Sequence, residues 1–429
     1  MSAGARLQEI LAGFQRSFWV ANFTEIFERL AYYATLAVLA IFLNEQLHFS
    51  AELTGSIIGI FGLVVYFLPT AGGALADRFG FRRALLFAFF IMTIGYFLLG
   101  SLSAPWMQSI RHALGDKWLV ILVLLIPALG PATVKPCVAG TIARASNETS
   151  RSMGYSIYYT LVNVGGTLGP LLAYLVRRRL GLGMENVFRT AALSVFLMFW
   201  VTLFFYHEPP KRDGEQVSSV GVAIRNLFEV LGNGRFVAFL LITSGFYIVW
   251  WQIYIMAPLF IRRFVNPDAN TDALLAIEGL AVISLQILVT YVTRRMSAVP
   301  TISLGFLITG LAFILMAIHP SVFSFAVMLV VIALGEVTQA SRYYEYCSRL
   351  APPGQEGLYM GYAFPPIGLG AWVGGLMGGW LLHEFGDVLK RPTEMWWPVV
   401  GVGVVTAGLM LLYDRVLRPA RAVEADAKA

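Results

Sequence analysis

Apolar stretches separated by shorter polar segments follow one another along the chain from Phe18 to Leu412. Each stretch approaches the length of about 20 residues that an α-helix needs to cross the hydrocarbon core of a bilayer. The pattern predicts an all-α membrane protein with twelve transmembrane helices. The expected helices cover residues 18–43, 52–76, 82–103, 118–143, 153–176, 188–206, 236–261, 272–293, 299–318, 322–347, 357–382 and 395–414.

The longest polar segment lies between the sixth and seventh expected helices and reads HEPPKRDGEQVSSVGVAIRNLFEVLGNGR. It divides the helices into six plus six, a hydropathy pattern typical of transporters built from a duplicated unit. The sequence therefore predicts an N-terminal six-helix bundle at 1–206, a cytoplasmic linker at 207–235 and a C-terminal six-helix bundle at 236–429.

The composition excludes a soluble globular protein. The chain is 58% hydrophobic and 13% charged, whereas soluble domains carry about 25% charged residues. A net charge of +6 fits arginines in loops that face the cytoplasm. The lipid bilayer is thus an expected partner, and nucleic acid is not.

The basic residues also predict an orientation. With both termini in the cytoplasm, the cytoplasmic loops hold more lysine and arginine than the external ones, as the positive-inside rule requires. Arg177, Arg178 and Arg179 would lie on the outer side, where contact with lipid headgroups is the simplest explanation. We expect a multi-pass protein of the cell membrane (inner or plasma membrane), with no signal peptide.

No sequence pattern indicates catalysis. The chain contains neither a G-x-x-x-x-G-K-[ST] phosphate loop nor a G-x-S-x-G nucleophile elbow. The five histidines are scattered without the spacing of metal ligands. We therefore expect no enzymatic activity, no cofactor and no metal, and transport would be driven by an ion gradient.

The first expected helix carries charges at positions that should be buried. Glu25, Glu28, Arg29 and Tyr32 follow the spacing i, i+3, i+4, i+7 and therefore share one helix face. Each charge at the centre of a bilayer costs about 3 kcal/mol on insertion scales. Such residues are expected to pair with one another or with charges on neighbouring helices.

Two further charges are predicted to lie at a similar depth. Lys135 belongs to the fourth expected helix and Glu336 to the tenth. Paired ionisable groups inside a helix bundle mark a proton or substrate path. A purely structural cluster of ion pairs is the alternative.

The loop after the second expected helix reads GGALADRFGFRRAL and resembles the signature of the major facilitator superfamily. The resemblance implies that superfamily's fold, with two six-helix bundles around a central cavity, and a conformational latch in this loop. The glycines permit close helix packing, and the aspartate can pair with arginines across the loop. The latch residues would be Gly73, Asp77, Arg78, Gly80, Arg82 and Arg83.

A second resemblance is narrower. Four segments are similar to signatures of the proton-dependent oligopeptide transporter family. They are the motif E-x-x-E-R-x-x-Y-Y in the first helix, the lysine of VKP in the fourth, GYSIYYTLVNVGG in the fifth and the glutamate of ALGEV in the tenth. The resemblance implies a symporter that imports small peptides with protons, by alternating access.

The resemblance implies a role for the residues of this chain that occupy the positions of the family's site residues. Glu25, Glu28 and Arg29 would couple proton movement to transport. The expected substrate contacts are Tyr32, Tyr33, Lys135, Tyr158, Asn163, Trp251, Glu278 and Glu336. Arg342 and Glu345, three residues apart, are expected to form a salt bridge at an inner gate. Protons and a small-molecule substrate are the expected partners, and a monomer is the expected state.

The chain departs from the family pattern at several of these positions. Leu36 replaces an arginine, Glu278 stands where the family has asparagine, and Trp251 precedes Gln252 where many members have glutamate. Two other functions therefore remain open. One is a drug–proton antiporter, because GGTLGP at 165–170 partly matches an exporter motif, and the other is an importer of nitrate or small carboxylates.

Overall fold

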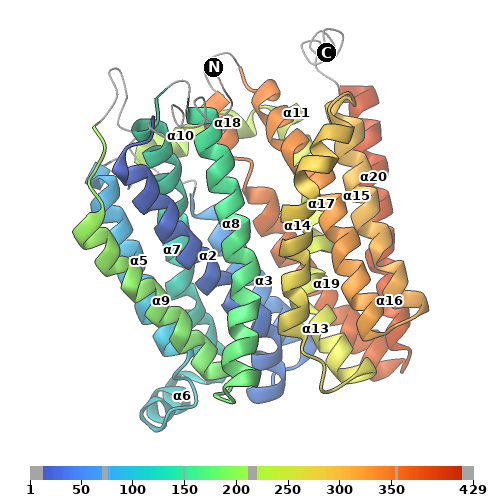
Figure 1. The fold of residues 1–429 in the computed structure, drawn as a ribbon. Coiled ribbons are helices and arrows are strands. Elements are labelled where there is room, and N and C mark those ends of the chain that lie inside the picture. Colours follow the sequence, from blue (N-terminus) through green and yellow to red (C-terminus); the bar gives the residue numbers. More distant parts are fainter. Residues whose placement is uncertain are drawn as a thin grey trace. The chain divides into compact units, whose positions relative to one another are not determined.

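The computed structural model describes residues 13–69, 76, 78–147, 150–210, 220–352 and 356–417. Within these ranges the chain forms helices and no β-strand (Figure 1). Ten of the described helices are long and apolar enough to cross a membrane. Two helices of 17 residues, α3 (Ala51–Phe67) and α19 (Pro365–Leu381), account for the other expected spans. The prediction of an all-α membrane protein is confirmed.

Among the described residues, the N-terminal half forms six long helices and four short ones. The long helices are α2 (Arg16–Ile41), α3, α5 (Phe81–Leu99), α7 (Asp116–Ala145), α8 (Arg151–Tyr174) and α9 (Met184–Phe205). The short ones are η1 (Phe42–Gln46), η2 (Pro105–Met107), α6 (Gln108–Leu114) and η3 (Leu175–Arg179).

The C-terminal half repeats the six-span pattern with more interruptions. Its described helices are α11 (Gly234–Trp250), α12 (Gln252–Ile255), α13 (Ala257–Phe260), η4 (Ile261–Val265), α14 (Thr271–Thr293), α15 (Ala298–Ala312), α16 (Ile314–Ile318), α17 (Val322–Leu350), α18 (Glu356–Gly361), α19, η5 (Leu382–Val388), η6 (Pro392–Met395) and α20 (Trp396–Leu417). The helix α10 (Val220–Leu231) lies in the expected linker.

Proline explains three differences from the expected spans. The second expected span continued to residue 76, but α3 ends at Phe67, two residues before Pro69. The seventh is divided into α11, α12 and α13, and Pro258 in the first turn of α13 accounts for the break between α12 and α13. The eleventh begins with α18 and is interrupted before Pro365. Proline lacks the backbone donor that continues a helix and restricts the residue before it.

By its contacts the chain forms two compact units. The first comprises Met1–Thr35 and Phe67–Ala223, and the second comprises Leu36–Tyr66 and Ile224–Ala429. The C-terminal end of α2 and most of α3 therefore group with the C-terminal helices. The three-part division at 206 and 235 stays a prediction.

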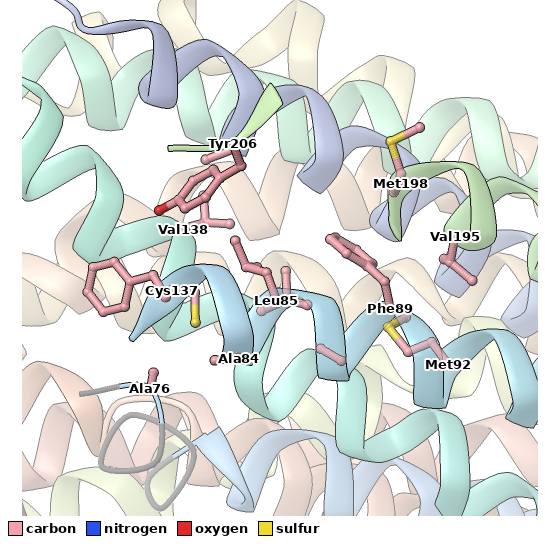
Figure 2. Packing of buried hydrophobic residues seen from close by; sticks show 14 of the residues in the cluster. Ala76, Ala84, Leu85, Phe89, Met92, Cys137, Val138, Val195, Met198 and Tyr206 are labelled. Atoms are coloured by element: carbon pink, nitrogen blue, oxygen red, sulfur yellow. The ribbon is translucent and has the colours of Figure 1, made fainter. Parts of the chain in front are cut away.

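Close packing of α5 against α7 and α9 forms the core of the first unit (Figure 2). Leu85 and Phe89 of α5 are fully buried and belong to one cluster with Val138 of α7 and Val195 of α9. A Cβ atom on Gly95 would lie 2.3 Å from the ring of Pro127, so α5 and α7 approach each other as closely as glycine permits. In a bilayer such interfaces gain mainly van der Waals contact.

Among the described residues, four spans end in a π-helical turn. These turns are η1 after α2, η3 after α8, η4 after α13 and η5 after α19. In the expected order they follow spans one, five, seven and eleven, so each turn in the first half has a counterpart six spans later. π-turns are rare, and their matched positions support an internal duplication.

Candidate functional site

The charged face of α2 forms a buried ion-pair cluster in the first unit. Glu25 and Glu28 have no exposed surface and Arg29 is 2% exposed. Arg29 donates two hydrogen bonds to Glu28, from Nε to Oε2 and from Nη2 to Oε1 at 2.6 Å. Its Nε also lies 3.5 Å from Oε1 of Glu25, one helical turn away. This bidentate geometry is the strong form of an arginine–carboxylate interaction.

Two neighbouring helices contribute to the same cluster. Tyr158 of α8 donates a hydrogen bond to Oε1 of Glu25 at 3.3 Å. Lys135 of α7 is half-buried and interacts electrostatically with both glutamates and with Arg29. Among the described residues, Oε2 of Glu25 finds no hydrogen-bond partner. Two acids and two bases thus share one site, and one carboxylate oxygen is left unsatisfied.

Small residues on α8 explain why Tyr158 reaches α2. A Cβ atom on Gly165 would lie 2.6 Å from the carbonyl oxygen of Ile26, and one on Gly169 would lie 2.7 Å from the backbone nitrogen of Ala34. The two helix backbones therefore touch at both glycines. The exporter-like GGTLGP sequence thus has a packing function in this chain, whatever the direction of transport.

The other predicted contacts in this unit lie beside the cluster. Arg29 lies over the ring of Tyr32, with Cζ 5.1 Å from the ring centroid, a cation–π geometry. The half-buried ring of Tyr33 faces Gly166 of α8. Asn163 donates to the carbonyl of Tyr159 in its own helix at 2.9 Å.

A second group of polar side chains lies in the second unit. Trp250, at the end of α11, donates from Nε1 to Oε2 of Glu336 on α17 at 2.7 Å. Glu278 of α14, the helix that packs on α17, lies close enough to Glu336 for the two carboxyl groups to interact electrostatically. The indole N–H of Trp250 thus gives Glu336 a hydrogen-bond donor within the second unit.

Sequence reasoning named Trp251 for this region, whereas the contact with the acids is made by Trp250. Trp251 has no exposed surface, donates to the carbonyl of Ile367 at 3.0 Å and packs against Gly62. The ring and the N–H of Trp251 are thus occupied by packing. Adjacent helical residues point about 100° apart, so the apolar pattern alone did not distinguish the two tryptophans.

Part of the latch loop, including Gly73 and Asp77, lies outside the described residues. Gly80 has a φ of 86°, a conformation that favours glycine, directly before α5. Arg82 donates from Nη2 to the carbonyl of Leu203 at 2.6 Å. Arg78 and Arg83 are exposed.

Glu208 is a residue of this region that sequence reasoning missed. Its carboxylate accepts hydrogen bonds from the backbone nitrogens of Phe81 and Arg82 at 2.8 and 3.2 Å, at the first turn of α5. Arg144 at the end of α7 lies 3.7 Å from the same carboxylate and 3.9 Å from the ring centroid of Phe81. The only sequence signal was a charge directly after the sixth span.

We expect Glu208→Ala to lower the free energy of unfolding by about 1–2 kcal/mol, because two donors at the start of α5 lose their acceptor. Thermal unfolding of the purified variant in detergent measures the loss. Glu208→Gln keeps an acceptor and should lose less. Equal stability of all three proteins would contradict the capping role.

The model of the Major Facilitator Superfamily matches residues 22–364 and, in a second match, residues 267–429. The chain belongs to the major facilitator superfamily. It is a multi-pass integral membrane protein with the superfamily's transporter fold, so the predictions of family and fold are confirmed.

Curated superfamily relatives cover most of the chain at low identity. "Multidrug resistance protein MdtH" of Aeromonas salmonicida is 24% identical, over 92% of this chain and 94% of the relative. The protein of the same name from Proteus mirabilis is 21% identical, over 88% of this chain and 89% of the relative.

Among solved structures, a peptide transporter POT in complex with sulfate superposes with a TM-score of 0.75 at 17% identity, covering 94% of this chain and 97% of that one. A POT family transporter in complex with 5-aminolevulinic acid gives 0.75 at 18% identity, covering 93% and 96%. These superpositions establish the fold.

Arg342 and Glu345 form the expected salt bridge, 2.8 Å from Nη1 to Oε2. Glu345 also accepts from Arg349 at 2.5 Å, and Arg342 donates to the carbonyl of Thr293 at 3.0 Å. The group ties α17 to the end of α14. Its role as an inner gate of the transporter stays a prediction.

A second set of ion pairs lies at the π-helical turns of the second unit. Arg262 of η4 pairs with Glu45 of η1 at 2.7 Å. Asp387 of η5 pairs with Arg263 and lies 3.5 Å from His383. Partial burial opposes ionisation of Asp387, but the hydrogen bond and charge of Arg263 hold its pKa below the usual value. These contacts join the ends of α2, α13 and α19, which are far apart in the sequence.

Glycines bring α3 and α19 into backbone contact near these ion pairs. A Cβ atom on Gly375 would lie 2.2 Å from the carbonyl oxygen of Gly55, and one on Gly379 would lie 2.8 Å from that of Ala51. Two grooves of about 560 and 540 Å³, in contrast, are lined almost entirely by apolar side chains and contain none of the predicted site residues.

We expect Gly375→Ala to lower the free energy of unfolding by about 1–3 kcal/mol, because the added methyl group cannot fit without separating α3 from α19. Gly401→Ala is the matched control, since nothing lies within 4 Å of a Cβ atom there. Melting temperatures of both variants in detergent test the difference. A Gly375→Ala protein as stable as the control would show that the helices separate at little cost.

Proposed function

We propose that the chain is a proton-coupled secondary active transporter, a symporter that imports small peptides or peptide-like solutes by alternating access. The observation that carries the proposal is the buried cluster of Glu25, Glu28, Arg29 and Lys135. It combines a carboxylate oxygen that lacks a partner with a half-buried lysine side chain. Ionisable residues inside a bundle are costly and are kept for proton or substrate movement.

The charge balance of the cluster would couple proton binding to substrate binding. With both acids ionised, the two acids and two bases of the cluster sum to zero. A proton on Glu25 leaves a net charge of +1, and Lys135 is then able to bind the carboxylate of a substrate. Loss of that proton restores the competition between Glu25 and the substrate for Lys135. Proton and substrate would therefore bind and leave together, which is a coupling free energy between two ligands.

The remaining expected contacts extend this proposal. Tyr32, Tyr33 and Asn163 lie on the helices that carry the cluster, and Glu278 and Glu336 would meet the amino end of a peptide from the second unit. We further propose a monomer in the bacterial inner membrane with cytoplasmic termini, in keeping with the bacterial source of the curated relatives.

A drug–proton antiporter is the second candidate. The names of the curated relatives favour it. So does the group of Glu278, Glu336 and Trp250, since carboxylates next to an aromatic ring suit an organic cation. The two candidates require opposite directions of net substrate movement relative to the proton.

Proteoliposomes with an imposed proton gradient distinguish them. Uptake of labelled dialanine in the direction of proton flow would support the symporter. Movement of a cationic dye against proton flow, with no peptide transport, would overturn it in favour of the antiporter. Uptake of nitrate in the same assay tests the remaining possibility, an importer of nitrate or small carboxylates.

We expect Lys135→Ala to weaken substrate binding by about ten- to a hundredfold, because a charge-assisted hydrogen bond contributes about 1.5–3 kcal/mol. Binding to the purified variant is measured with the substrate that the transport assay identifies. Lys117→Ala is the control, since Lys117 lies in the first turn of the same helix, over the ring of Trp118. Unchanged affinity in Lys135→Ala would assign Lys135 a purely structural role.

A further inference from the structure

A groove of about 540 Å³ lies between three helices of the first unit, α2, α8 and α9, which are neighbours in Figure 1. Its described lining is aliphatic or aromatic except for the side chains of Arg16 and Asn22. Asn22 is buried and donates to the carbonyl of Phe18 in its own helix. The apolar lining includes Trp19, Phe23, Ile26, Leu161 and Phe205. The groove therefore combines one charged side chain with an apolar wall.

The groove runs inward from one membrane surface. Arg16 is the first residue of α2 and Phe205 is the last of α9, so the two lie at the same end of the first unit. Ile26 is ten residues further along α2, about 15 Å at a rise of 1.5 Å per residue. That length is half of the roughly 30 Å hydrocarbon core. The groove thus has the depth of one leaflet, with its arginine at the membrane surface.

The groove and the ion-pair cluster occupy opposite faces of α2. At about 100° per residue, the side chains of Arg16 and Glu25 point in opposite directions. Trp19 and Phe23 of α2 are 43% and 44% exposed, and Phe205 of α9 is 46% exposed. On helices that cross a membrane, large apolar rings with so much exposed surface face lipid. The groove is therefore open to the bilayer and separate from the cluster proposed to bind proton and substrate.

The charge of Arg16 is available to an anion from outside the chain. Its Cζ lies 5.6 Å from the ring centroid of Phe205, a cation–π contact that orients the guanidinium without neutralising it. Among the described residues, Arg16 has no ion-pair or hydrogen-bond partner. Glu208, three residues after Phe205, is held by backbone donors of α5 and by Arg144. Its carboxylate is therefore already occupied.

We propose that this groove binds a phospholipid with an anionic headgroup, with the phosphate on Arg16 and an acyl chain along Trp19 and Phe23. The planar guanidinium matches two phosphate oxygens, and the groove gives the chain van der Waals contact over the depth of its leaflet. In a zwitterionic headgroup the phosphate is balanced by its own ammonium group. In phosphatidylglycerol it is not, so Arg16 favours that lipid.

The second apolar groove of the protein lacks this selectivity. It has about 560 Å³ and is lined by side chains of α11, α19 and α20 such as Leu241, Val373 and Val405, with no charged residue in its described lining. Acyl chains of any lipid fit such a surface equally. A water-soluble phosphate, in turn, would gain the contact with Arg16 and nothing from the apolar wall. The combination of both features therefore favours an anionic phospholipid.

Trp19 lies in the groove and reports on its occupant. The purified full-length protein is reconstituted in vesicles of dioleoyl phosphatidylcholine and phosphatidylglycerol, with bromine on the acyl chains of one lipid or the other, because bromine quenches a tryptophan that it contacts. Brominated phosphatidylglycerol should quench Trp19 at about fivefold lower mole fraction, since a basic side chain near the surface contributes about 1 kcal/mol. The chain has ten tryptophans, so Trp19→Phe defines the contribution of Trp19.

Arg16→Gln should reduce this preference to about equality, because it keeps the groove and removes the charge. Arg294→Gln is the matched control. Arg294 is also exposed and lies over an aromatic ring, with Cζ 4.0 Å from the ring centroid of Tyr291, but it lines neither groove. This variant should keep the fivefold preference.

Three results would overturn the proposal. The first is equal quenching of Trp19 by the two lipids, or by neither, in the unmodified protein. The second is an unchanged preference in Arg16→Gln. The third is competition by soluble glycerol phosphate as strong as that by phosphatidylglycerol, which would mean that Arg16 binds phosphate without the apolar wall. None of these measurements involves transport, so failure here is distinct from failure of the proposed function.

Discussion

Replacing Arg29 with methionine is expected to lower the free energy of unfolding by about 3–5 kcal/mol. The change leaves the carboxylates of Glu25 and Glu28 buried without the guanidinium that contacts both. Removing one partner of a buried ion pair leaves an uncompensated charge, and this is far more costly than removing the whole pair. Thermal unfolding in detergent measures the effect.

Two further variants make this test specific. Adding Glu28→Gln to Arg29→Met should restore part of the stability, because one of the unpaired charges is gone. Arg111→Met is the control, since Arg111 also forms a bidentate pair, with Asp116 at 2.7 Å, but both side chains are partly exposed. Exposed pairs contribute about 0–1 kcal/mol. Equal losses of unfolding free energy in Arg29→Met and Arg111→Met would show that the charges of the buried cluster interact only weakly.

Glu25→Gln is expected to abolish uphill uptake while substrate exchange continues. An imposed gradient of one pH unit can drive about tenfold accumulation for each coupled proton, because about 1.4 kcal/mol corresponds to a factor of ten. Glutamine has nearly the same shape but cannot carry the proton, so accumulation should fall to equality across the membrane. Proteoliposome uptake at fixed gradients measures the ratio.

The control for this variant is Glu185→Gln. Glu185 also pairs with an arginine one turn further along its helix, Arg189 at 3.7 Å, but both side chains are partly exposed. Accumulation should match that of the unmodified protein. If Glu25→Gln still concentrates substrate about tenfold per pH unit, proton coupling belongs to residues other than Glu25.

Local features of the chain were readable from the sequence. The number of spans follows from apolar length, since a backbone in lipid must satisfy its hydrogen bonds within a helix. The shared face of Glu25, Glu28 and Arg29 follows from helical spacing alone, and Arg29 does contact both acids. The loop motif at 72–85 led to the superfamily that the family model also matches.

Contacts between distant helices were decided only by the tertiary structure. Four features depend on how helices rotate and approach one another. They are the proximity of Glu278 to Glu336, the contact of Trp250 rather than Trp251 with Glu336, the cap by Glu208, and the grouping of Leu36–Tyr66 with the second unit. In a soluble protein an apolar stripe would indicate that rotation. Here lipid and protein interior are equally apolar, so an apolar face does not show which side of a helix is buried, and small residues such as Gly55 and Gly165 set the contacts. The sequence determined which segments cross the membrane, and packing at these glycines decided which side chains meet.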